Sequence, residues 1–391
     1  MNEPRPPITI LGTGALAMRF GATLARAGHA VTLAGTWAEG LAAMGGRGIE
    51  VVEEGPLPPA AYGPLPPTPS PNSGGGGGWF AGVETIDLSA NKVPQSSPPQ
   101  PVILPLPQNW GRGSGGGGRR PSGIESRMPS AEADLSPSRY LLVLVKSHQT
   151  PRLAPVAARL AAPDGLIVTL QNGLGNAECL AAAAGPDRVA VGVTTLGAAV
   201  AGPGRVRFGG DGTVTIGRSA ATAARVDALV DILVAAGIDA AATDDIAPTV
   251  WRKLAVNCAI NPLTAYLGVP NGRLLEDPQT IALLHAAAAE VAAVAAALGI
   301  PLDADVAALA EAVAARTAAN RSSMLQDTDR GAPTEIDAIN GAVVRAGETV
   351  GVETPVNAAL WHAIVSLTAD DAASPRPRDV GSLIERTARC P

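Results

Sequence analysis

The sequence predicts an α/β domain with a doubly wound, mostly parallel sheet, followed by an all-helical domain. Apolar runs and helical stretches alternate through the first part of the chain, as in consecutive βαβ units. The run YLLVLV at 140–145 is continuously apolar, which is typical of a strand buried on both faces of a parallel sheet. Beyond Thr222 nearly every segment has helical spacing. We therefore expect the domain boundary near Asp244.

Length, composition and charge agree with two globular domains. A chain of 391 residues with 46% hydrophobic composition can bury two cores. The expected ranges are 1–244, 245–372 and a tail at 373–391. Three widely spaced cysteines argue against a disulfide framework and for a reducing compartment, and no zinc-binding pattern is present. A net charge of −6 gives no electrostatic reason to expect nucleic acid or an anionic membrane as a partner.

Two segments of the sequence indicate where in the cell the protein is located. The N-terminus, MNEPRPPITILGTG, lacks a basic region followed by a long apolar core, so we expect a cytoplasmic protein. The most membrane-like run, 281–300, carries His285 and Glu290, and a charge at mid-span is costly in hydrocarbon. We expect this run to be a buried helix of a soluble domain.

The chain begins with a βαβ unit and then changes character. Strands are expected at 8–11 and 30–33, with a helix between them that Gly28 ends. Nearly half of the chain's 35 prolines and two glycine runs fall within about 55–139, so we expect a mostly unstructured insertion there. Its two apolar islands, 79–83 and 102–106, could form short strands, but a flexible loop is favoured.

The remaining strands and helices follow from apolar patterning. Strands are expected at 166–170, 189–195, 205–208 and 213–216, the last two joined as a hairpin through 209–212. No strand is expected after them. Within the helical region, Pro262 should stop a helix and bias Asn261 toward an extended backbone.

A glycine-rich turn lies between the first strand and the first helix. Gly12, Gly14 and Ala17 form G-x-G-x-x-A, in which the glycines permit a tight turn and close approach to a pyrophosphate. A purely structural glycine turn is the alternative. The pattern favours a dinucleotide-binding, Rossmann-like domain, whose expected cofactor contacts here are Gly12, Thr13, Gly14, Ala15, Leu16 and Ala17.

The end of the second strand bears on the choice of dinucleotide. Residues 34–37 (AGTW) contain no carboxylate to hold the 2′-hydroxyl of NAD, so NADP is the better candidate. The arginine that would meet a 2′-phosphate is absent too. Thr36 could donate one hydrogen bond, and Lys146, at the end of YLLVLV, could contribute positive charge.

A polar stripe marks the segment 251–272. Lys253, Asn257 and Asn261 are each four residues apart, so on a helix they share one face within an apolar stretch. Burying an ammonium and two amides without partners costs several kcal/mol. A ligand could supply those partners.

Five motifs together resemble the ketopantoate reductase (2-dehydropantoate 2-reductase) family. They are GTGALA, VKSHQT, LQNGLGN, WRKLAVNCAINPLT and SSMLQDTDRGAPTEIDAING, and the resemblance covers about 1–54 and 140–365. It implies NADPH-dependent reduction of 2-dehydropantoate to (R)-pantoate in the pantothenate and coenzyme A pathway. The expected partner is a small 2-keto acid, and a homodimer is a candidate assembly.

The resemblance also implies residue roles. Lys253 resembles the family's proton donor to the ketone oxygen. Ser323 resembles the residue that binds the substrate carboxylate. The implied substrate contacts are Asn172, Asn257, Asn261, Asn271, Ser323, Met324, Leu325 and Gln326. Further cofactor contacts are implied at Asn172, Gly197 and Glu335, in addition to Thr36, Lys146 and the glycine turn.

Each assignment has a structural alternative. Asn271, Ser322 or Ser323 could cap a helix, and Asn172 could belong to an ordinary Asn-Gly turn after a strand. Glu335 and Asp337 could be acids in the first turn of a helix. Lys253 could be a surface lysine, which the asparagines beneath it disfavour.

The chain departs from the family pattern at three points. Ala17 replaces the usual third glycine, the arginine after the second strand is missing, and the insertion is unusually large. These differences bear on the preference for NADP rather than on the reductase chemistry. A reductase of another branched 2-keto acid, which would use the same carboxylate and ketone contacts, is an alternative. A second alternative is a non-catalytic NADP-binding sensor or interaction protein that uses the proline-rich segment as a docking arm, although such a protein has no need for the stripe of Lys253 and the asparagines.

Overall fold

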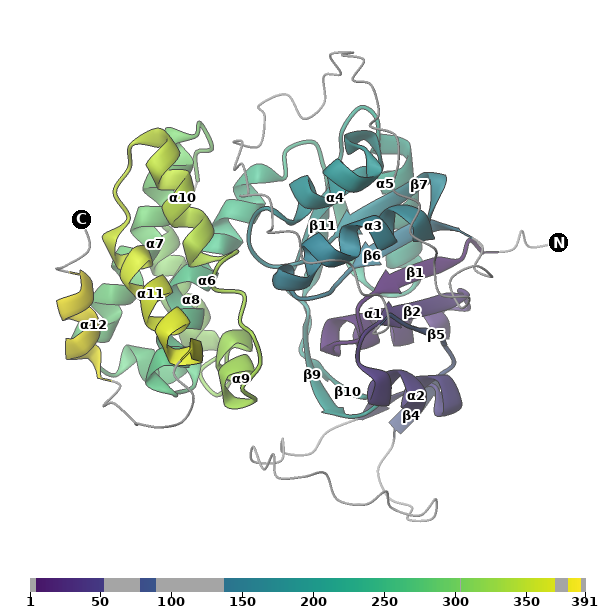
Figure 1. The fold of residues 1–391 in the computed structure, drawn as a ribbon, viewed down its shortest axis with the longest axis horizontal. Helices are drawn as coiled ribbons and strands as arrows, with labels where there is room; N and C mark the ends of the chain where they lie inside the picture. Colours follow the sequence, from purple (N-terminus) through teal and green to yellow (C-terminus); the bar gives the residue numbers. More distant parts are fainter. Residues whose placement is uncertain (1–4, 53–77, 89–136, 303, 370–378, 388–391) are drawn as a thin grey trace.

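A computed structural model describes residues 5–52, 78–88, 137–302, 304–369 and 379–387. An α/β part carries the N-terminal elements, and a bundle of helices carries the C-terminal ones. The two parts lie next to each other along the long axis of the molecule (Figure 1). The predicted fold class is confirmed by this arrangement.

The α/β part is built on an eight-stranded sheet with the order β12-β11-β8-β7-β6-β1-β2-β5. The six strands from β8 to β5 are parallel, and their order is that of a doubly wound dinucleotide-binding sheet. Strand β11 joins β8 antiparallel, and β12 joins β11 parallel. The strands are β1 (Ile8–Leu11), β2 (Val31–Gly35), β5 (Glu84–Asp87), β6 (Ser138–Val143), β7 (Ala161–Thr169), β8 (Val189–Thr194), β11 (Thr213–Gly217) and β12 (Asp239–Thr243).

Helices cover both faces of this sheet. Apolar residues of α1 (Ala15–Arg26) and α5 (Ala223–Ala235) share one buried cluster with the strands, and those of α3 (Thr150–Leu160) and α4 (Asn176–Ala184) share another. The strands in the middle are therefore buried on both sides, which explains the continuous apolar run in β6. The other helical elements of the α/β part are α2 (Ala38–Arg47) and the short 3₁₀ turns η1 (Ser147–Gln149) and η2 (Pro186–Arg188).

A second sheet, with the order β4-β3-β10-β9, contradicts the predicted hairpin. It contains β4 (Gly78–Ala81), β3 (Ile49–Val52), β10 (Arg205–Gly209) and β9 (Gly197–Gly202). Strand β10 pairs antiparallel with β9, whereas β11 pairs with β8 in the main sheet. The prediction was wrong because β9, GAAVAG, has small side chains that give no strand pattern.

The expectation of an unstructured insertion is wrong for its first apolar island. Strand β4 pairs antiparallel with β3, and β5 pairs parallel with β2 at the edge of the main sheet. Ile86 and Leu88 are buried there. The second island, 102–106, lies outside the described residues.

Strand β12 is a further correction, because no strand was expected after β11. Its sequence DAAAT has three alanines, which favour helix intrinsically. Pairing with β11 along all five residues outweighs that preference.

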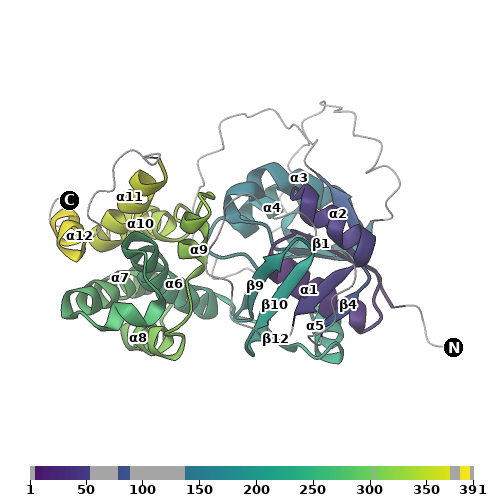
Figure 2. The same cartoon turned by 90° about the horizontal axis from the view of Figure 1, so that it is seen from below.

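The helical part surrounds α6 (Ala247–Leu267), which packs against several of its neighbours (Figure 2). The other elements are η3 (Asn271–Leu275), α7 (Pro278–Ala297), α8 (Val306–Arg316), α9 (Ser323–Asp329), α10 (Asn340–Val350), α11 (Pro355–Ala369) and α12 (Val380–Thr387). One cluster of small aliphatic side chains forms their common core.

Helix α6 does not stop at Pro262, contrary to the prediction. A proline in a helix leaves the carbonyl four residues earlier without its N–H donor. That carbonyl belongs to Cys258, and it accepts a hydrogen bond from Asn340 Nδ2 at 3.1 Å instead. Asn261 is therefore helical and continues the stripe of Lys253 and Asn257.

Helix α7 is, within the described part of the chain, the one helix long and apolar enough to cross a membrane by length and composition. The core helix of a soluble protein meets the same criteria, and 44% of the apolar window is buried here. Leu284, Ala287, Ala288 and Val291 belong to the core of the helical part. The absence of a membrane partner stays a prediction.

Candidate active site

The glycine turn lies at the carboxyl end of β1 and has a backbone that only glycine adopts easily. Gly12 has φ +144°, and a Cβ there would lie 2.9 Å from the carbonyl carbon of Leu144. Gly14 precedes the first turn of α1, and a Cβ there would meet nothing within 4 Å. Gly12 is thus needed by the fold itself, while Gly14 leaves open space at a helix N-terminus, where an anion is favoured.

The other residues predicted for the nucleotide turn surround this space. Ala17 is buried on α1, whereas Ala15 and Leu16 are partly exposed in its first turn. Thr13 is buried against Gly35 at the end of β2, and Thr36 follows directly and is partly exposed. The turn, Thr13 and Thr36 therefore line neighbouring carboxyl ends of the parallel sheet.

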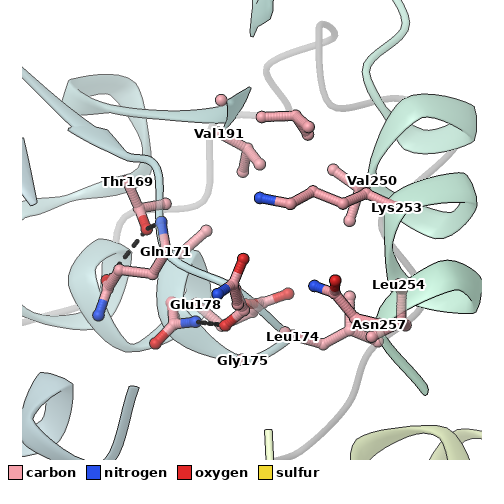
Figure 3. A pocket seen from close by; sticks show the side chains of 16 residues that line it. Thr169, Gln171, Leu174, Gly175, Glu178, Val191, Val250, Lys253, Leu254 and Asn257 are labelled. Atoms are coloured by element: carbon pink, nitrogen blue, oxygen red, sulfur yellow. Dashed lines mark hydrogen bonds between the residues drawn. The ribbon is translucent and has the colours of Figure 1, made fainter. Parts of the chain in front are cut away.

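A pocket lies at the junction of the two parts (Figure 3). Lys253 and Asn257 project into it from α6, together with Val250 and Leu254. The opposite wall is the segment 171–178 after β7, which includes Asn172, and the middle of β8. The structure thus brings together three of the predicted site residues from two distant segments.

The pKa of Lys253 is lowered from 10.5 to about 8, because burial disfavours the charged ammonium. The carboxylate of Glu335 acts in the opposite sense and raises the pKa. Among the pocket residues drawn in Figure 3, none forms a hydrogen bond with this ammonium. A lysine with a pKa near neutrality can donate a proton and retain positive charge until it does so.

Glu335 connects the two parts. Its carboxylate accepts hydrogen bonds from the backbone N–H of Ser147 at 3.0 Å and from Asn172 Nδ2 at 3.3 Å. Lys146 Nζ lies 3.7 Å from the same carboxylate. The alternative of a first-turn helix acid is wrong for both Glu335 and Asp337, because α10 begins only at Asn340.

Asn172 belongs to the predicted Asn-Gly turn, and its contacts with cofactor and substrate stay a prediction. Gly173 after it has φ +82°, as an Asn-Gly turn requires, and a Cβ on Gly173 would lie 2.3 Å from the carbonyl oxygen of Ala338. The next residue, Leu174, donates its N–H to the same carbonyl. The turn is therefore structural, and it also holds the Asn172 side chain against Glu335.

Lys146 forms an ion pair that the sequence did not predict. Its ammonium lies 2.6 Å from the carboxylate of Asp327 on α9, which is only 2% exposed. Arg330 binds the other oxygen of Asp327 at 2.7 Å. The available signal was spacing, because Asp327 is four residues after Ser323 in the same motif and so shares its helix face.

The predicted residues of α9 have different surroundings. Ser322, not Ser323, caps the helix, since its Oγ accepts the N–H of Leu325. Ser323 is partly exposed in the first turn, whereas Met324 and Leu325 are buried in the helical core. Gln326 Nε2 donates to the carbonyl of Arg321.

Asn261 and Asn271 lie outside the pocket lining, and both are 7% exposed. Asn271 begins η3 but does not cap it, because its Nδ2 donates to the hydroxyl of Thr317 at 2.8 Å. Its Oδ1 is buried and has no hydrogen-bond partner among the described residues. An unpaired buried amide oxygen fits a ligand-binding role better than a capping role.

Gly197 lies away from this pocket, at the start of β9. A Cβ there would lie 2.5 Å from the carbonyl oxygen of Gly209, so the position requires close backbone approach within the second sheet. Its own carbonyl accepts a hydrogen bond from Arg19. The structure therefore gives Gly197 a packing role, and its cofactor role stays a prediction.

Four polar residues of the pocket lining were not predicted from the sequence: Thr169, Gln171, Asn176 and Glu178. Gln171 Nε2 donates to the carbonyl of Val145 and to the hydroxyl of Thr150, which ties the loop after β7 to the loop after β6. Glu178 is in the first turn of α4, and burial raises the pKa of its carboxyl. The backbone N–H groups of Gly175 and of Glu178 itself act in the opposite sense and lower that pKa.

The fold and the site together define an oxidoreductase with a Rossmann-like sheet and a helical C-terminal part. The family model for Ketopantoate reductase PanE/ApbA matches residues 8–73 and 114–221, and the model for its C terminal matches 245–367. The chain belongs to the ketopantoate reductase family, and the resemblance inferred from the motifs is confirmed.

Two relatives with the same enzyme name support this family assignment. A 2-dehydropantoate 2-reductase of Halobacterium salinarum is 41% identical over 239 residues, which is 61% of this chain and 77% of the relative. One from Archaeoglobus fulgidus is 39% identical over 223 residues, or 57% and 74% of the two chains.

Solved structures show the same fold. A PanE/ApbA family ketopantoate reductase from Ralstonia eutropha JMP134 has a TM-score of 0.70 and 26% identity, covering 93% of this chain and 98% of that one. A D-mandelate dehydrogenase with NADH and anilino(oxo)acetate has a TM-score of 0.72 with the same coverage. At 23% identity, that second likeness shows the fold alone.

Proposed function

We propose that the protein reduces 2-dehydropantoate to (R)-pantoate with NADPH, and that Lys253 donates the proton. The observation that carries the proposal is the lysine itself, which lies at the junction of the two parts with a pKa of about 8. The names of the relatives supply the substrate. The pathway is pantothenate and coenzyme A synthesis, and the cytoplasm is its expected location.

The glycine turn supports a dinucleotide cofactor, which would supply the hydride. Gly12, Thr13 and Gly14 leave a helix N-terminus open to a pyrophosphate, with Ala15, Leu16 and Ala17 in the following turn. Residues 34–37 offer no carboxylate to a ribose 2′-hydroxyl, which favours NADPH over NADH. Thr36 and Lys146 are the groups proposed to face its phosphate side.

The chain's own residues account for the proton step. As the carbonyl oxygen gains negative charge, the Lys253 ammonium stabilises it and then transfers a proton to it. Glu335 keeps positive charge on the lysine by its electrostatic effect on the pKa. Asn257, Asn261 and Asn271 are proposed to bind the hydroxyl and carbonyl groups of the substrate, and Ser323 its carboxylate.

Steady-state oxidation of NADPH by the purified protein tests this proposal. Turnover should be fastest with 2-dehydropantoate in a panel of branched 2-keto acids, and faster with NADPH than with NADH. If another keto acid has a higher kcat/KM, the substrate assignment is wrong while the reductase chemistry stands. No turnover of any keto acid by folded protein that binds NADPH would favour a sensor.

A further inference from the structure

An ion pair between a buried carboxylate and a partly exposed lysine joins the two parts of the molecule at α9. Asp327 of α9 is 2% exposed, and its Oδ2 binds Lys146 Nζ of the α/β part at 2.6 Å. Its Oδ1 binds Arg330 of the same helix at 2.7 Å. In both overall views α9 lies on the side of the helical part that faces the α/β part (Figure 1, Figure 2).

Stability alone does not account for this arrangement. Withdrawing the Asp327 carboxylate from water costs free energy that its attraction to the partly exposed Lys146 and Arg330 only roughly offsets, and an apolar side chain is often at least as stable there. An ion pair does, however, fix the relative position of its two partners, because both oxygens of Asp327 have directional hydrogen bonds. The pair is therefore better suited to positioning α9 than to stabilising the fold.

Helix α9 is held at its other end by α6. Ser322, the residue that caps α9, accepts a hydrogen bond from the hydroxyl of Thr264 at 2.7 Å. Thr264 lies one turn beyond Asn261 on the helix that carries Lys253. Ser323 and Asp327 are four residues apart on α9 and share one face, so Ser323 lies between the two attachments.

We propose that Asp327 is a positioning residue, which holds Lys146 across the junction and thereby fixes Ser323 relative to the cofactor and to Lys253. This inference rests on the proposed function, because it takes Lys146 as a cofactor contact and Ser323 as the carboxylate contact. The buried carboxylate of Asp327 then couples the cofactor site to the substrate site.

Asp327→Asn tests the inference, with Asp329→Asn as the matched control. The control removes the same charge from the same helix, at a surface pair with Arg321. Asp327→Asn should raise the KM for 2-dehydropantoate and the Kd for NADPH by ~10-fold each, within the usual range of coupling between sites, and change kcat much less. The control should leave all three within about twofold, as expected for a surface pair.

A double-mutant cycle separates positioning from general damage. Lys146→Met, although it removes a cofactor contact, should also raise the KM for the keto acid at saturating NADPH. Combined with Asp327→Asn it should raise that KM no further, because both changes break one link. If the two substitutions raise the KM additively, the proposal is overturned. Tighter NADPH binding by Asp327→Asn also overturns it, because Asp327 would then compete with the nucleotide for Lys146.

Two further outcomes are distinguishable. If Asp327→Asn does not fold, Lys146→Met with Asp327→Leu removes both charges of the pair across the junction and leaves only the partly exposed Arg330 without its partner. A normal KM in that folded variant overturns the proposal. If the wild-type protein does not reduce 2-dehydropantoate, the proposed function fails. The cycle measured on NADPH affinity then still tests the link between Lys146 and Asp327, and additive losses overturn it.

Discussion

Lys253 is held in conditions that suit a proton donor at neutral pH. Burial lowers its pKa to about 8, and Glu335, which is fixed by Ser147 and Asn172, moderates that effect. The sequence predicted the lysine and Glu335 as site residues. It could not predict the pKa, which depends on how much water the folded junction excludes.

Replacing the lysine should remove acid catalysis. Lys253→Ala should lower kcat by ~10²- to 10⁴-fold, the usual contribution of a general acid, with little change in NADPH affinity. Rapid-mixing kinetics at saturating substrates would measure it, with circular dichroism to confirm folding. A loss of less than tenfold with chemistry still rate-limiting would remove Lys253 from this role.

The pH dependence should follow the same group. Lys253 must be protonated to act as an acid, so activity should be high below a pH of about 8 and fall as the pH rises through that value. The measurement is kcat/KM for 2-dehydropantoate between pH 6 and 10. If the residual activity of Lys253→Ala still falls above the same pH, the fall is caused by another group.

The two glycines of the nucleotide turn should respond differently to alanine. Gly12→Ala introduces a clash and an unfavourable φ, so it should destabilise the protein by ~1–3 kcal/mol. Gly14→Ala has room for its methyl group and should leave the melting temperature unchanged, but weaken NADPH binding by hindering approach of the pyrophosphate. Unchanged NADPH affinity in Gly14→Ala would favour a purely structural turn.

At the scale of elements, α6 shows how a distant side chain can keep a proline within a helix. Asn340 donates to the Cys258 carbonyl that Pro262 leaves free, and it also donates to Asn357 Oδ1. This keeps Lys253, Asn257 and Asn261 on one continuous helix. The spacing of the stripe predicted the shared face, but local rules for proline predicted a break.

The hydrogen bond from Asn340 to the Cys258 carbonyl can be tested by removing it from the wild-type protein and from the Pro262→Ala variant. Asn340→Ala should lower the free energy of unfolding by ~1–3 kcal/mol, the cost of leaving a buried group unpaired. In Pro262→Ala protein the N–H at 262 can bind the same carbonyl, so the cost should be smaller. Urea unfolding measures both, and an equal cost in the two backgrounds would contradict the explanation.

Strands β9 and β12 show why some strands could not be predicted from the sequence. Both consist mainly of small residues, GAAVAG in β9 and DAAAT in β12, and are at least partly exposed, so they have no clear pattern of large apolar residues. Their backbones form strands because β10 and β11 offer hydrogen-bond partners. The clearly patterned strands, β1, β6 and β8, are those whose side chains are buried on both faces.

At the scale of the whole molecule, β4 and β5 lie within the proline- and glycine-rich region but belong to the two sheets. Replacing 78–88 with a flexible linker of equal length should lower the melting temperature by ~5 °C or more, because it removes an edge strand from each sheet and exposes the partners of Ile86 and Leu88. Deleting 91–134, which contains none of the described strands, should change it less. Calorimetry of both proteins gives the comparison, and a larger effect of the second deletion would contradict it.

The sequence by itself determined the order of α/β and helical parts, the glycine turn and the single face shared by Lys253, Asn257 and Asn261. Each of these depends on the chemistry of neighbouring residues, which repeats at helical or strand spacing. Only the tertiary structure decided the partners of β9 and β12, the continuation of α6 through Pro262, and the contact of Lys146 with Asp327 across 181 residues of chain. Those outcomes depend on which distant groups satisfy a backbone or a buried charge, and local sequence does not encode that choice.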